Sequence, residues 1–571
     1  MSTKRRNFRV TFAVTALLLL AASVLLTDVL GGFGGARVDL TSERLYTMAP
    51  AAKDILKGLK APVQVKLYIT GAASMPTELK TLERDVTDKL RDYAQASDGM
   101  IQYSIHDPQD DEDLQGKLAE RGIQPFQVQS IEKDEIGVKL IWSAMTVAYK
   151  DRPEEVLPQV LPQSLATFEY DLISRVYRLT RDRDPKVALV APLQEVDPQL
   201  AMQYLQRGMQ PPEPTDVFTS IAQYLQQEHY QVERVSLTAD SRIPADADAL
   251  LVLNPSGFDE RQAFEINRAI SNGVNALIAV QLHTYGYQPG MRGGFTISGA
   301  SQTSGLESVL GAFGVTVDTR HLLDASHETL AVPRTQNIGG MRFQTSEPVR
   351  LPVQVKVTET QMNQDSPLSN RIASLLYLWG SALDLDTATM SANGLTSTVL
   401  FTGSERAWRA PFTEGLLPGS LFAPEGKQIE PRLPLAVLLE GSFPDAFAGR
   451  PTPAWPAATT DGAVAPPAVD AVTPLRAGKA RVAVVGCAKM FDDMGLQAGQ
   501  NALLLLNAVD ALTHGEDMIS IRSKALTQRV IRPVDDGEKL LFRLFAAVLV
   551  PAALAAFGLL RAAKRRKEAA R

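Results

Sequence analysis

The sequence predicts an α/β protein whose central domain holds a Rossmann-like or flavodoxin-like parallel sheet. Three short apolar runs carry this prediction: Lys186–Val190, Ala249–Leu253 and Gly273–Val280. Helical patterns lie between them, and continuous apolar strands that alternate with helices are typical of a parallel sheet covered on both faces. A smaller thioredoxin-like α/β domain is expected before this domain, and one transmembrane helix is expected at each end of the chain.

The apolar segment near the N-terminus predicts an uncleaved membrane anchor within residues 1–35. Basic residues precede Val10–Leu26, which carries no charge and contains Leu17 and Leu20. This run is longer than the ~7–15 residues of a signal-peptide core, and no convincing cleavage site follows it. The segment is therefore expected to remain in the membrane as a first transmembrane helix.

The C-terminal segment, residues 539–571, predicts a second transmembrane helix and a basic tail. Leu544–Leu560 carries no charge and contains Pro551, which membrane helices tolerate better than soluble helices do. Because basic residues flank a span on its cytoplasmic side, both termini are expected in the cytoplasm. The bulk of the chain would then lie in the periplasm, held to the lipid of a bacterial inner membrane.

Charge and cysteine content argue against a nucleic-acid-binding protein and against a disulfide-stabilised fold. The 571 residues carry a net charge of −6 although both ends are basic, so the part between them is strongly acidic. An acidic exported body is not expected to bind nucleic acid. Cys487 is the only cysteine, so an intramolecular disulfide framework is impossible.

Residues 36–183 are predicted to form the thioredoxin-like domain, because a β-α-β order followed by a hairpin is compatible with that fold. The expected elements are a helix at Pro50–Leu59, a strand at Val63–Ile69, a helix over 79–93, a strand at Ile101–Ile105, a helix over 109–121, a strand or hairpin at Ile136–Tyr149 and a helix from Leu165 to Leu179. No Cys-x-x-Cys motif occurs, so redox chemistry of the thioredoxin kind is not expected.

Residues 184–443 are predicted to form the central domain, which residues 480–538 complete after a Pro/Ala-rich loop at 444–479. Further strands are expected at Gln231–Leu237, Ser397–Phe401, Leu433–Leu439 and Ala480–Gly486, and helices at Phe218–Glu228, Asp259–Ser271, Ser304–Phe313, Leu368–Leu383 and Asn501–Leu512. Loops are expected at Gln194–Asp216 and His283–Ser304, and short strands with long loops at Arg320–Gln361.

Polar residues follow two of the predicted parallel strands and mark a candidate binding crevice. Asn254 and Ser256 come after one strand, and Gln281 and His283 come after the next. Ligands of open α/β sheets bind outside the carboxyl ends of the strands. We therefore expect any ligand to contact these four side chains.

The chain lacks the motifs that would indicate an enzyme. The sequence contains no P-loop, no Gly-x-Gly-x-x-Gly after a strand, no His-Glu-x-x-His and no Gly-x-Ser-x-Gly. We therefore expect no catalytic residue, no nucleotide site, no cofactor and no capacity to power transport alone.

Two further groups of residues could carry chemistry, but the sequence favours a structural role for each. His321 and His327 lie near Asp324 and Glu328, but their spacing does not place both histidines on one helix face, so a polar loop is preferred to a metal site. Cys487 ends a predicted buried strand, where a free cysteine is more often a small apolar filler than a nucleophile. The neighbouring residues Asp492 and Asp493 are interpreted as caps rather than an acid/base pair.

Four stretches in this order resemble the GldG family, the gliding-motility auxiliary components of ABC transporters. They are Asp39-Leu40-Thr41 with Leu45-Tyr46-Thr47, the central parallel-sheet domain, Val482–Gly486 with Asn501 and Asn507-Ala508-Val509-Asp510, and Asp517 to Lys524 before the last span. The resemblance implies a non-catalytic exported subunit that works beside an ABC-2-type permease and, through it, a separate ABC ATPase. It also implies a central domain similar to that of intraflagellar-transport proteins and to the glutamine-amidotransferase-like fold.

The chain departs from the family in two places. The amidotransferase Cys-His pair is not recognisable, and Cys487-Ala488-Lys489 stands where relatives are often acidic. The leading hypothesis is an inner-membrane-anchored auxiliary or substrate-engaging subunit of an ABC transporter. The alternatives are a membrane-anchored amidotransferase-like hydrolase, which would need a nucleophile and a base, and a periplasmic scaffold that binds only protein.

Overall fold

A computed structural model describes residues 48–514 and Ile521. Its gaps are residues 133–134, 166, 182, 195, 197, 290–294, 339–340, 367, 370–371, 457–458, 461–462 and 465–473. Both predicted membrane segments, with Leu17, Leu20, Leu544, Pro551 and Leu560, lie outside the described residues. Among the residues that are described, no helix is long and apolar enough to cross a membrane.

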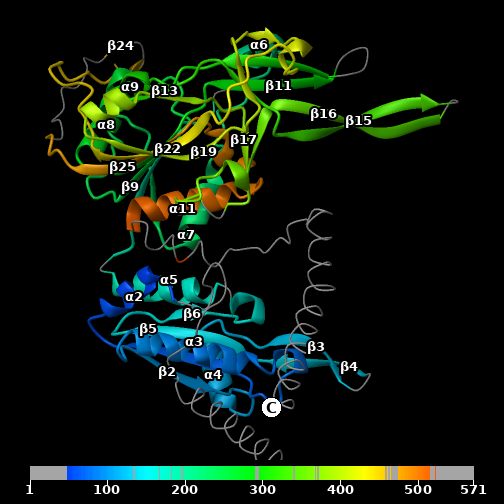
Figure 1. The fold of residues 1–571 in the computed structure, drawn as a ribbon, viewed down its shortest axis with the longest axis vertical. Coiled ribbons are helices and arrows are strands. Elements are labelled where there is room, and N and C mark those ends of the chain that lie inside the picture. Colours follow the sequence, from blue (N-terminus) through cyan, green and yellow to red (C-terminus); the bar gives the residue numbers. More distant parts are fainter. Residues whose placement is uncertain are drawn as a thin grey trace, which may run out of the picture. The chain divides into compact units, whose positions relative to one another are not determined.

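The N-terminal part of the fold is a four-stranded mixed sheet in the order β2-β1-β5-β6 (Figure 1). Strand β1 (Val63–Ile69) pairs in parallel with β2 (Ile101–His106) and antiparallel with β5 (Ser143–Tyr149), which pairs antiparallel with β6 (Glu155–Leu157). The helices are α2 (Pro50–Lys57), α3 (Leu82–Ala96), α4 (Glu112–Glu120) and α5 (Phe168–Thr180). The predicted β-α-β order and the antiparallel strands after it are confirmed, whereas the thioredoxin-like classification stays a prediction.

The two faces of this sheet follow from the alternation of side chains along β1. Val65 and Leu67 pack in a core with α2, α3 and α5, whereas Tyr68 packs in a smaller cluster with Leu118 of α4. Successive residues of a strand face opposite sides, so one strand serves both cores. The sheet is therefore covered by helices on both faces.

The predicted strand or hairpin at Ile136–Tyr149 is two strands of different sheets. Strand β4 (Glu135–Ile141) pairs with β3 (Phe126–Glu132) in a separate hairpin, and β5 belongs to the main sheet. The break falls at Trp142, whose backbone N–H donates to Thr70 Oγ1 at 2.9 Å and whose carbonyl accepts from the Thr70 N–H at 3.0 Å.

The central domain is built on a seven-stranded sheet in the order β19-β22-β25-β10-β9-β7-β8. Five of its strands run parallel: β7 (Lys186–Val190), β8 (Gln231–Arg234), β9 (Ala249–Leu253), β10 (Asn275–Ala279) and β25 (Lys479–Val485). Strand β22 (Pro434–Ser442) runs antiparallel to β25 and to β19 (Thr396–Thr402). Numbered along the chain, the five parallel strands lie in the order 2-1-3-4-5.

Helices cover both faces of this sheet because the strands are apolar on both faces. Leu251 of β9 packs in a core with α7 (Thr219–Gln227) and α11 (Asn501–His514). Its neighbour Leu250 packs in a second core with α8 (Glu260–Ser271) and α9 (Glu307–Ala312). The predicted parallel strands and their two-sided burial are confirmed, whereas the Rossmann-like or flavodoxin-like classification stays a prediction.

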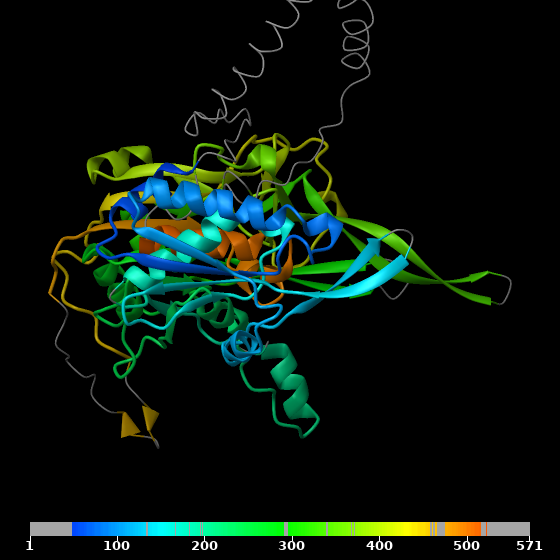
Figure 2. The same ribbon diagram turned by 90° about the horizontal axis from the view of Figure 1, so that it is seen from below.

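A long insertion between β10 and β25 supplies the elements around the ends of the parallel strands. Its elements are β11 (His283–Pro289), β12 (Phe295–Ser301), β13 (Val315–Val317), β14 (His321–Asp324), β15 (His327–Ile338), β16 (Met341–Thr358), β17 (Ser374–Leu378), β18 (Leu383–Leu385), α10 (Thr387–Ala392), β20 (Ala407–Ala410), β21 (Gly415–Leu416), β23 (Thr459–Thr460) and β24 (Ala463–Val464), besides α9, β19 and β22. Strands β15 and β16 form a long hairpin that extends away from the central sheet (Figures 1 and 2).

Four sequence predictions for this domain are wrong. The expected helix at Leu368–Leu383 is replaced by β17 and β18, because β17 pairs with β16 and Trp379 adopts a positive φ of 62° that ends the strand. The expected loop at His283–Ser304 is the hairpin β11–β12. The expected loop at Gln194–Asp216 contains the helix α6 (Pro198–Gln206), and Arg320–Gln361 forms long strands rather than short ones.

Candidate functional site

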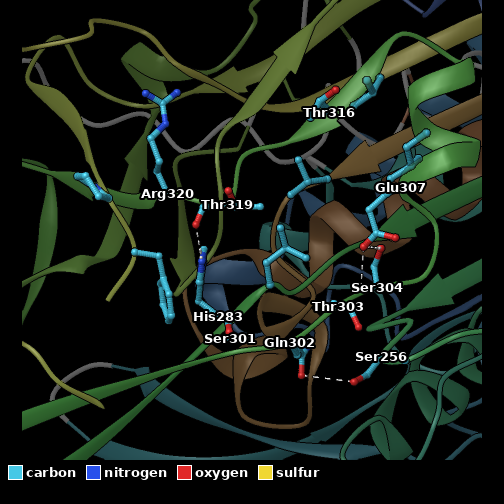
Figure 3. A pocket seen from close by; sticks show the side chains of 17 residues that line it. Ser256, His283, Ser301, Gln302, Thr303, Ser304, Glu307, Thr316, Thr319 and Arg320 are labelled. Atoms are coloured by element: carbon cyan, nitrogen blue, oxygen red, sulfur yellow. Dashed lines mark hydrogen bonds between the residues drawn. The ribbon is translucent and has the colours of Figure 1, made fainter. Parts of the chain in front are cut away.

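A cavity of about 860 Å³ lies at the carboxyl ends of β9 and β10 (Figure 3). Its walls come from the turns after these strands, the β12–α9 connection, α9, and the chain from β13 to the residue before β14. The lining side chains include Ser256, Leu282, His283, Ser301, Gln302, Thr303, Ser304, Glu307, Leu310, Val315, Thr316, Val317, Thr319, Arg320, Pro411 and Phe412. The cavity therefore combines hydroxyl groups, one amide and two charged groups with an apolar floor.

The structure brings two of the four predicted crevice residues to the cavity. Ser256 and His283 line it, whereas Asn254 and Gln281 support its wall. Asn254 adopts a positive φ of 49°, and its Oδ1 accepts a hydrogen bond from Gln302 Nε2 at 2.7 Å. Asn254 thus orients a residue of the cavity wall that sequence reasoning missed.

Gln281 is a structural residue in this arrangement. Its Nε2 donates to the carbonyl oxygens of His283 and Trp379 at 2.8 Å, and its Oε1 accepts from the N–H groups of Ala488 and Lys489 at 3.1 Å. A primary amide has two donor hydrogens and two acceptor sites, so all of them are used. Gln281 therefore links its own segment to two distant ones and has no hydrogen-bonding group left for a ligand.

His283 is held as a neutral imidazole in the cavity wall. Its Nε2 lies 3.0 Å from the carbonyl oxygen of Thr319, so Nε2 carries the proton, and Nδ1 accepts from Ser381 Oγ at 3.4 Å. The ring stacks on Phe412 with centroids 4.5 Å apart. Burial lowers the pKa of His283, although the Thr319 carbonyl and the Asp318 charge oppose this shift. The side chain can thus shape the cavity without adding charge.

His321 packs against Phe412, with ring centroids 4.6 Å apart, and is buried as well. Its Nδ1 is 2.7 Å from the Tyr285 hydroxyl, and its Nε2 accepts from the Thr413 N–H at 3.3 Å. Burial, with a smaller contribution from His283, lowers the pKa of His321 to about 4. The imidazole is therefore neutral at physiological pH.

The residues considered for a metal site are engaged elsewhere. Asp324 accepts from the backbone N–H groups of Ser326 and Ser404 at 2.8 and 2.7 Å. His327 Nδ1 contacts the Asp324 carbonyl oxygen at 2.9 Å, and Glu328 pairs with Lys356 at 2.7 Å. Within the described ranges no group of three or more His, Cys, Asp or Glu side chains could hold a metal ion.

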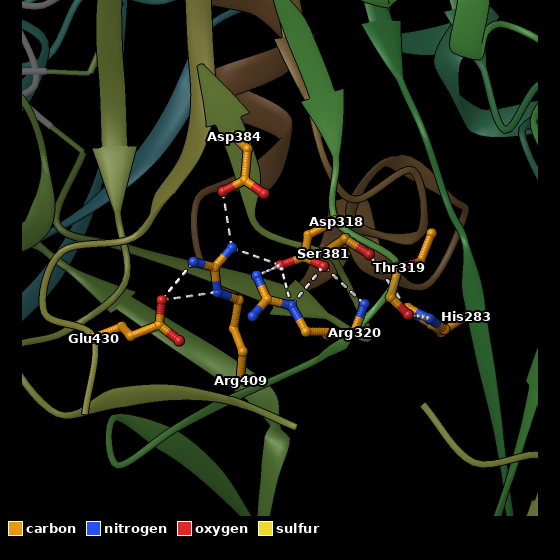
Figure 4. Close-up of polar contacts among 8 residues, drawn as sticks. All are labelled: His283, Asp318, Thr319, Arg320, Ser381, Asp384, Arg409 and Glu430. Carbon is orange, nitrogen blue, oxygen red and sulfur yellow. Dashed lines mark hydrogen bonds and ion pairs between the residues drawn. The ribbon is translucent and has the colours of Figure 1, made fainter. Parts of the chain in front are cut away.

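A charged network borders the cavity (Figure 4). Asp318 binds Arg320 Nε through both carboxylate oxygens at 3.0 Å and accepts from Arg409 Nη1 at 2.6 Å. Arg409 also binds Asp384 at 2.8 Å and Glu430. Burial raises the pKa of Asp318, but hydrogen bonds from Arg320 and Arg409 outweigh it and leave the pKa below its usual value. The network fixes Arg320, which lines the cavity.

Glu307 places a carboxylate on the opposite side of the cavity (Figure 3). Its Oε1 accepts from the Ser304 N–H and Oγ, both at 3.0 Å, and from the Gly305 N–H at 3.3 Å. Burial raises the pKa of Glu307. Hydrogen bonds from its own backbone, Ser304 and Gly305 outweigh this effect and leave the pKa below its usual value, so the carboxylate is charged. The acidic residue three positions after a serine at a helix start was the available sequence signal.

Cys487 is an inert core residue in the structure. Its thiol is buried and donates to the Leu378 carbonyl oxygen at 3.2 Å. Burial raises the pKa of Cys487 to about 12, so the thiolate that a nucleophile requires is not formed at neutral pH. The predicted caps are confirmed: Asp493 accepts from the Ser220 N–H at 2.7 Å, and Asp492 from the Gly495 N–H at 2.6 Å.

Comparison with known proteins places this fold in a family. Residues 184–509 match the family model of auxiliary components described as "ABC-type uncharacterized transport system", and residues 42–148 match a domain of unknown function, DUF7088. No curated protein matches the chain. A solved structure titled "mmIFT52 N-terminal domain" aligns with 58% of this chain and 98% of its own at 11% identity, with a TM-score of 0.28. Because the first match spans more than half of the sequence, the chain belongs to the auxiliary-component family of ABC-type transport systems.

Proposed function

We propose that this protein is a GldG-type, non-catalytic subunit that displays its α/β domains in the periplasm beside an ABC-2-type permease and a separate ATPase. The membership of residues 184–509 in the auxiliary-component family is the observation that carries the proposal. An auxiliary component implies partners in the transport system, and the sequence contains no P-loop of its own. In this proposal the cavity beside His283 and Arg320 takes the transported ligand.

The two apolar end segments support the proposed location. Val10–Leu26 and Leu544–Leu560 each carry no charge and have basic residues on the flank away from the body of the chain. Flanks of this kind remain on the cytoplasmic side of a membrane. Both ends would then anchor the protein in the inner membrane, with the described domains outside the cytoplasm.

Co-purification tests the proposed partners. A tagged chain expressed from its native locus and isolated in a mild detergent should bring down a multi-span permease and a protein with ATP-binding motifs at comparable amounts. Mass spectrometry identifies both, and a variant that lacks residues 539–571 serves as the control because it removes one anchor. Isolation of the chain alone at full yield would contradict the proposal.

The hydrolase alternative is not favoured, because the candidate nucleophile Cys487 is buried and protonated. Cys487→Ala should therefore leave transport unchanged. A complete loss of transport in a variant that still folds would restore the hydrolase alternative.

A further inference from the structure

We propose that the cavity binds a short peptide in its zwitterionic form, with the peptide carboxylate at Arg320 and its ammonium group at Glu307. This inference rests on the proposed function, because it names the ligand class of the same cavity. Figure 3 shows Arg320 on one side of the cavity and Glu307 on the other. One fixed cation and one fixed anion on opposite sides match a ligand whose two ends carry opposite charges.

The Arg320 end is prepared for an anion. Its Nε and Nη2 bind Asp318, at 3.0 and 2.8 Å, while none of the contacts in the described part of the chain engages Nη1. Asp318 cannot turn freely because Arg409 also holds it, and Glu430 and Asp384 hold Arg409 in turn. The guanidinium is therefore fixed in place, with donors left for a carboxylate, and the Thr319 side chain lies next to it along the cavity wall.

The Glu307 end is prepared for a cation or a strong donor. Its Oε1 is fixed by Ser304 and Gly305, whereas no other side chain among the described residues contacts Oε2. An ionised carboxylate with one oxygen anchored and one available is a directional acceptor. An ammonium group at this position would gain both a charge interaction and a hydrogen bond.

The lining between the two ends suits a short peptide backbone and small side chains. Leu282, Leu310 and Val315 supply apolar surface, and the hydroxyl groups of Ser301 and Thr316 can pair with peptide N–H and C=O groups. The volume of about 860 Å³ lies in the range of ligand pockets of roughly 300–1,000 Å³.

The local charge balance disfavours polyanionic ligands. Four carboxylates, those of Glu307, Asp318, Asp384 and Glu430, stand against the two guanidinium groups of Arg320 and Arg409. Together these six side chains carry a net charge of −2, which disfavours nucleotides and other phosphorylated molecules. A ligand without net charge but with charged ends meets no such repulsion.

A neutral sugar is the rival ligand, since hydroxyl groups line the cavity. A sugar offers no charge to either Arg320 or Glu307, so the available donors and acceptors of these groups would lose water without an ionic partner. The two classes can be separated by blocking the ends of a peptide one at a time.

The experiment uses the full chain in detergent micelles and isothermal titration calorimetry with tri-alanine. Tri-alanine should bind, and its C-terminal amide and N-acetyl derivatives should each bind at least tenfold more weakly. Arg320→Gln should abolish the difference between tri-alanine and its amide, and Glu307→Gln the difference between tri-alanine and its N-acetyl form. Arg432→Gln, at an exposed arginine paired with Glu405 outside the cavity, is the matched control.

Three results would overturn the inference: no heat from tri-alanine, equal binding of the blocked and free peptides, or tighter binding of maltotriose than of any peptide. Glutamine keeps the volume and the hydrogen-bonding capacity of Glu307, so the E307Q variant should fold, and circular dichroism checks both variants. Co-purification with a permease and an ATPase is measured separately. Failure of peptide binding with intact co-purification removes only the ligand class, whereas loss of co-purification removes the proposed function.

Discussion

His321 shows how the fold fixes the chemical state of a single residue. The imidazole is buried between Tyr285, Phe412 and the Thr413 backbone, and its pKa falls from 6.5 to about 4. In the unfolded chain His321 binds a proton below about pH 6.5, but in the folded chain it does so only below about pH 4. Protonation therefore favours the unfolded state between these two values.

Acidification should thus destabilise the protein between about pH 6.5 and pH 4. The loss from His321 is at most about 3 to 4 kcal/mol of unfolding free energy, since each pKa unit corresponds to ~1.4 kcal/mol. The lowered pKa of His283 acts in the same direction. Urea unfolding at a series of pH values measures the slope, and His321→Gln should flatten it.

The same substitution at His106, an exposed residue of the N-terminal domain, is the matched control for the pH series. A wild-type profile that is flat from pH 7 to pH 4, or one that His321→Gln leaves unchanged, would contradict this account of the buried imidazole.

Sequence reasoning leads to the cavity, whose role in binding stays a prediction, but it names only some of the residues that line it. Ser256 and His283 follow parallel strands, and the rule that ligands lie at the carboxyl ends leads to them directly. Gln281 lies at the same edge of the sheet, but its amide group already makes four hydrogen bonds within the protein. Arg320 and Glu307 were missed because they come from the insertion, and nothing in the local sequence tells which segments of an insertion return to the sheet.

Strands that are buried on both faces were predicted more accurately than strands outside the core. Strand β9 is a continuous apolar run with both faces in a core, and its predicted bounds are those of the structure. The hairpin β11–β12 was predicted as a loop because it is rich in glycine. Gly286 lies opposite Ser298, and a Cβ at that position would meet the Ser298 hydroxyl at 2.9 Å. A close approach between strands, rather than a turn, explains this glycine.

Helix α7 begins with a cap that comes from a distant part of the chain. The residue before the helix, Phe218, supplies no side-chain cap, whereas Asp493 accepts from the Ser220 N–H at 2.7 Å and from Thr219 Oγ1 at 2.6 Å. A carboxylate at a helix N-terminus satisfies free N–H groups and interacts favourably with the helix dipole. This contact therefore ties α7 to the turn after β25.

Asp493→Ala should lower the free energy of unfolding by about 1 kcal/mol, within the range of ~0.5–2 kcal/mol for lost helix caps. Urea unfolding followed by tryptophan fluorescence measures the change. Glu425→Ala, at an exposed position outside the sheet and its helices, is the control and should have no effect. An unchanged midpoint in the Asp493 variant would show that α7 does not depend on this cap.

The central sheet shows that the order of strands along the chain does not predict which strands pair. Strand β25 pairs with β10, although about 200 residues separate them in the sequence. The apolar pattern predicts that β25 is a buried strand, but its place beside β10 depends on pairing that only the complete fold determines. The insertion that separates the two strands also builds most of the cavity wall.

The proposed topology predicts on which side of the membrane each end of the chain lies. If both apolar end segments span the inner membrane, a green fluorescent protein at either terminus should fluoresce, because its chromophore forms in the cytoplasm but not after export through the general secretion pathway. Alkaline phosphatase fused after residue 514 should be active, because it folds only in the periplasm. The same fusion without residues 2–30 is the control and should be inactive, since the basic flank and the first apolar segment are then missing. A dark C-terminal fusion, or a mature chain that lacks Val10–Leu26, would contradict two anchors with cytoplasmic ends.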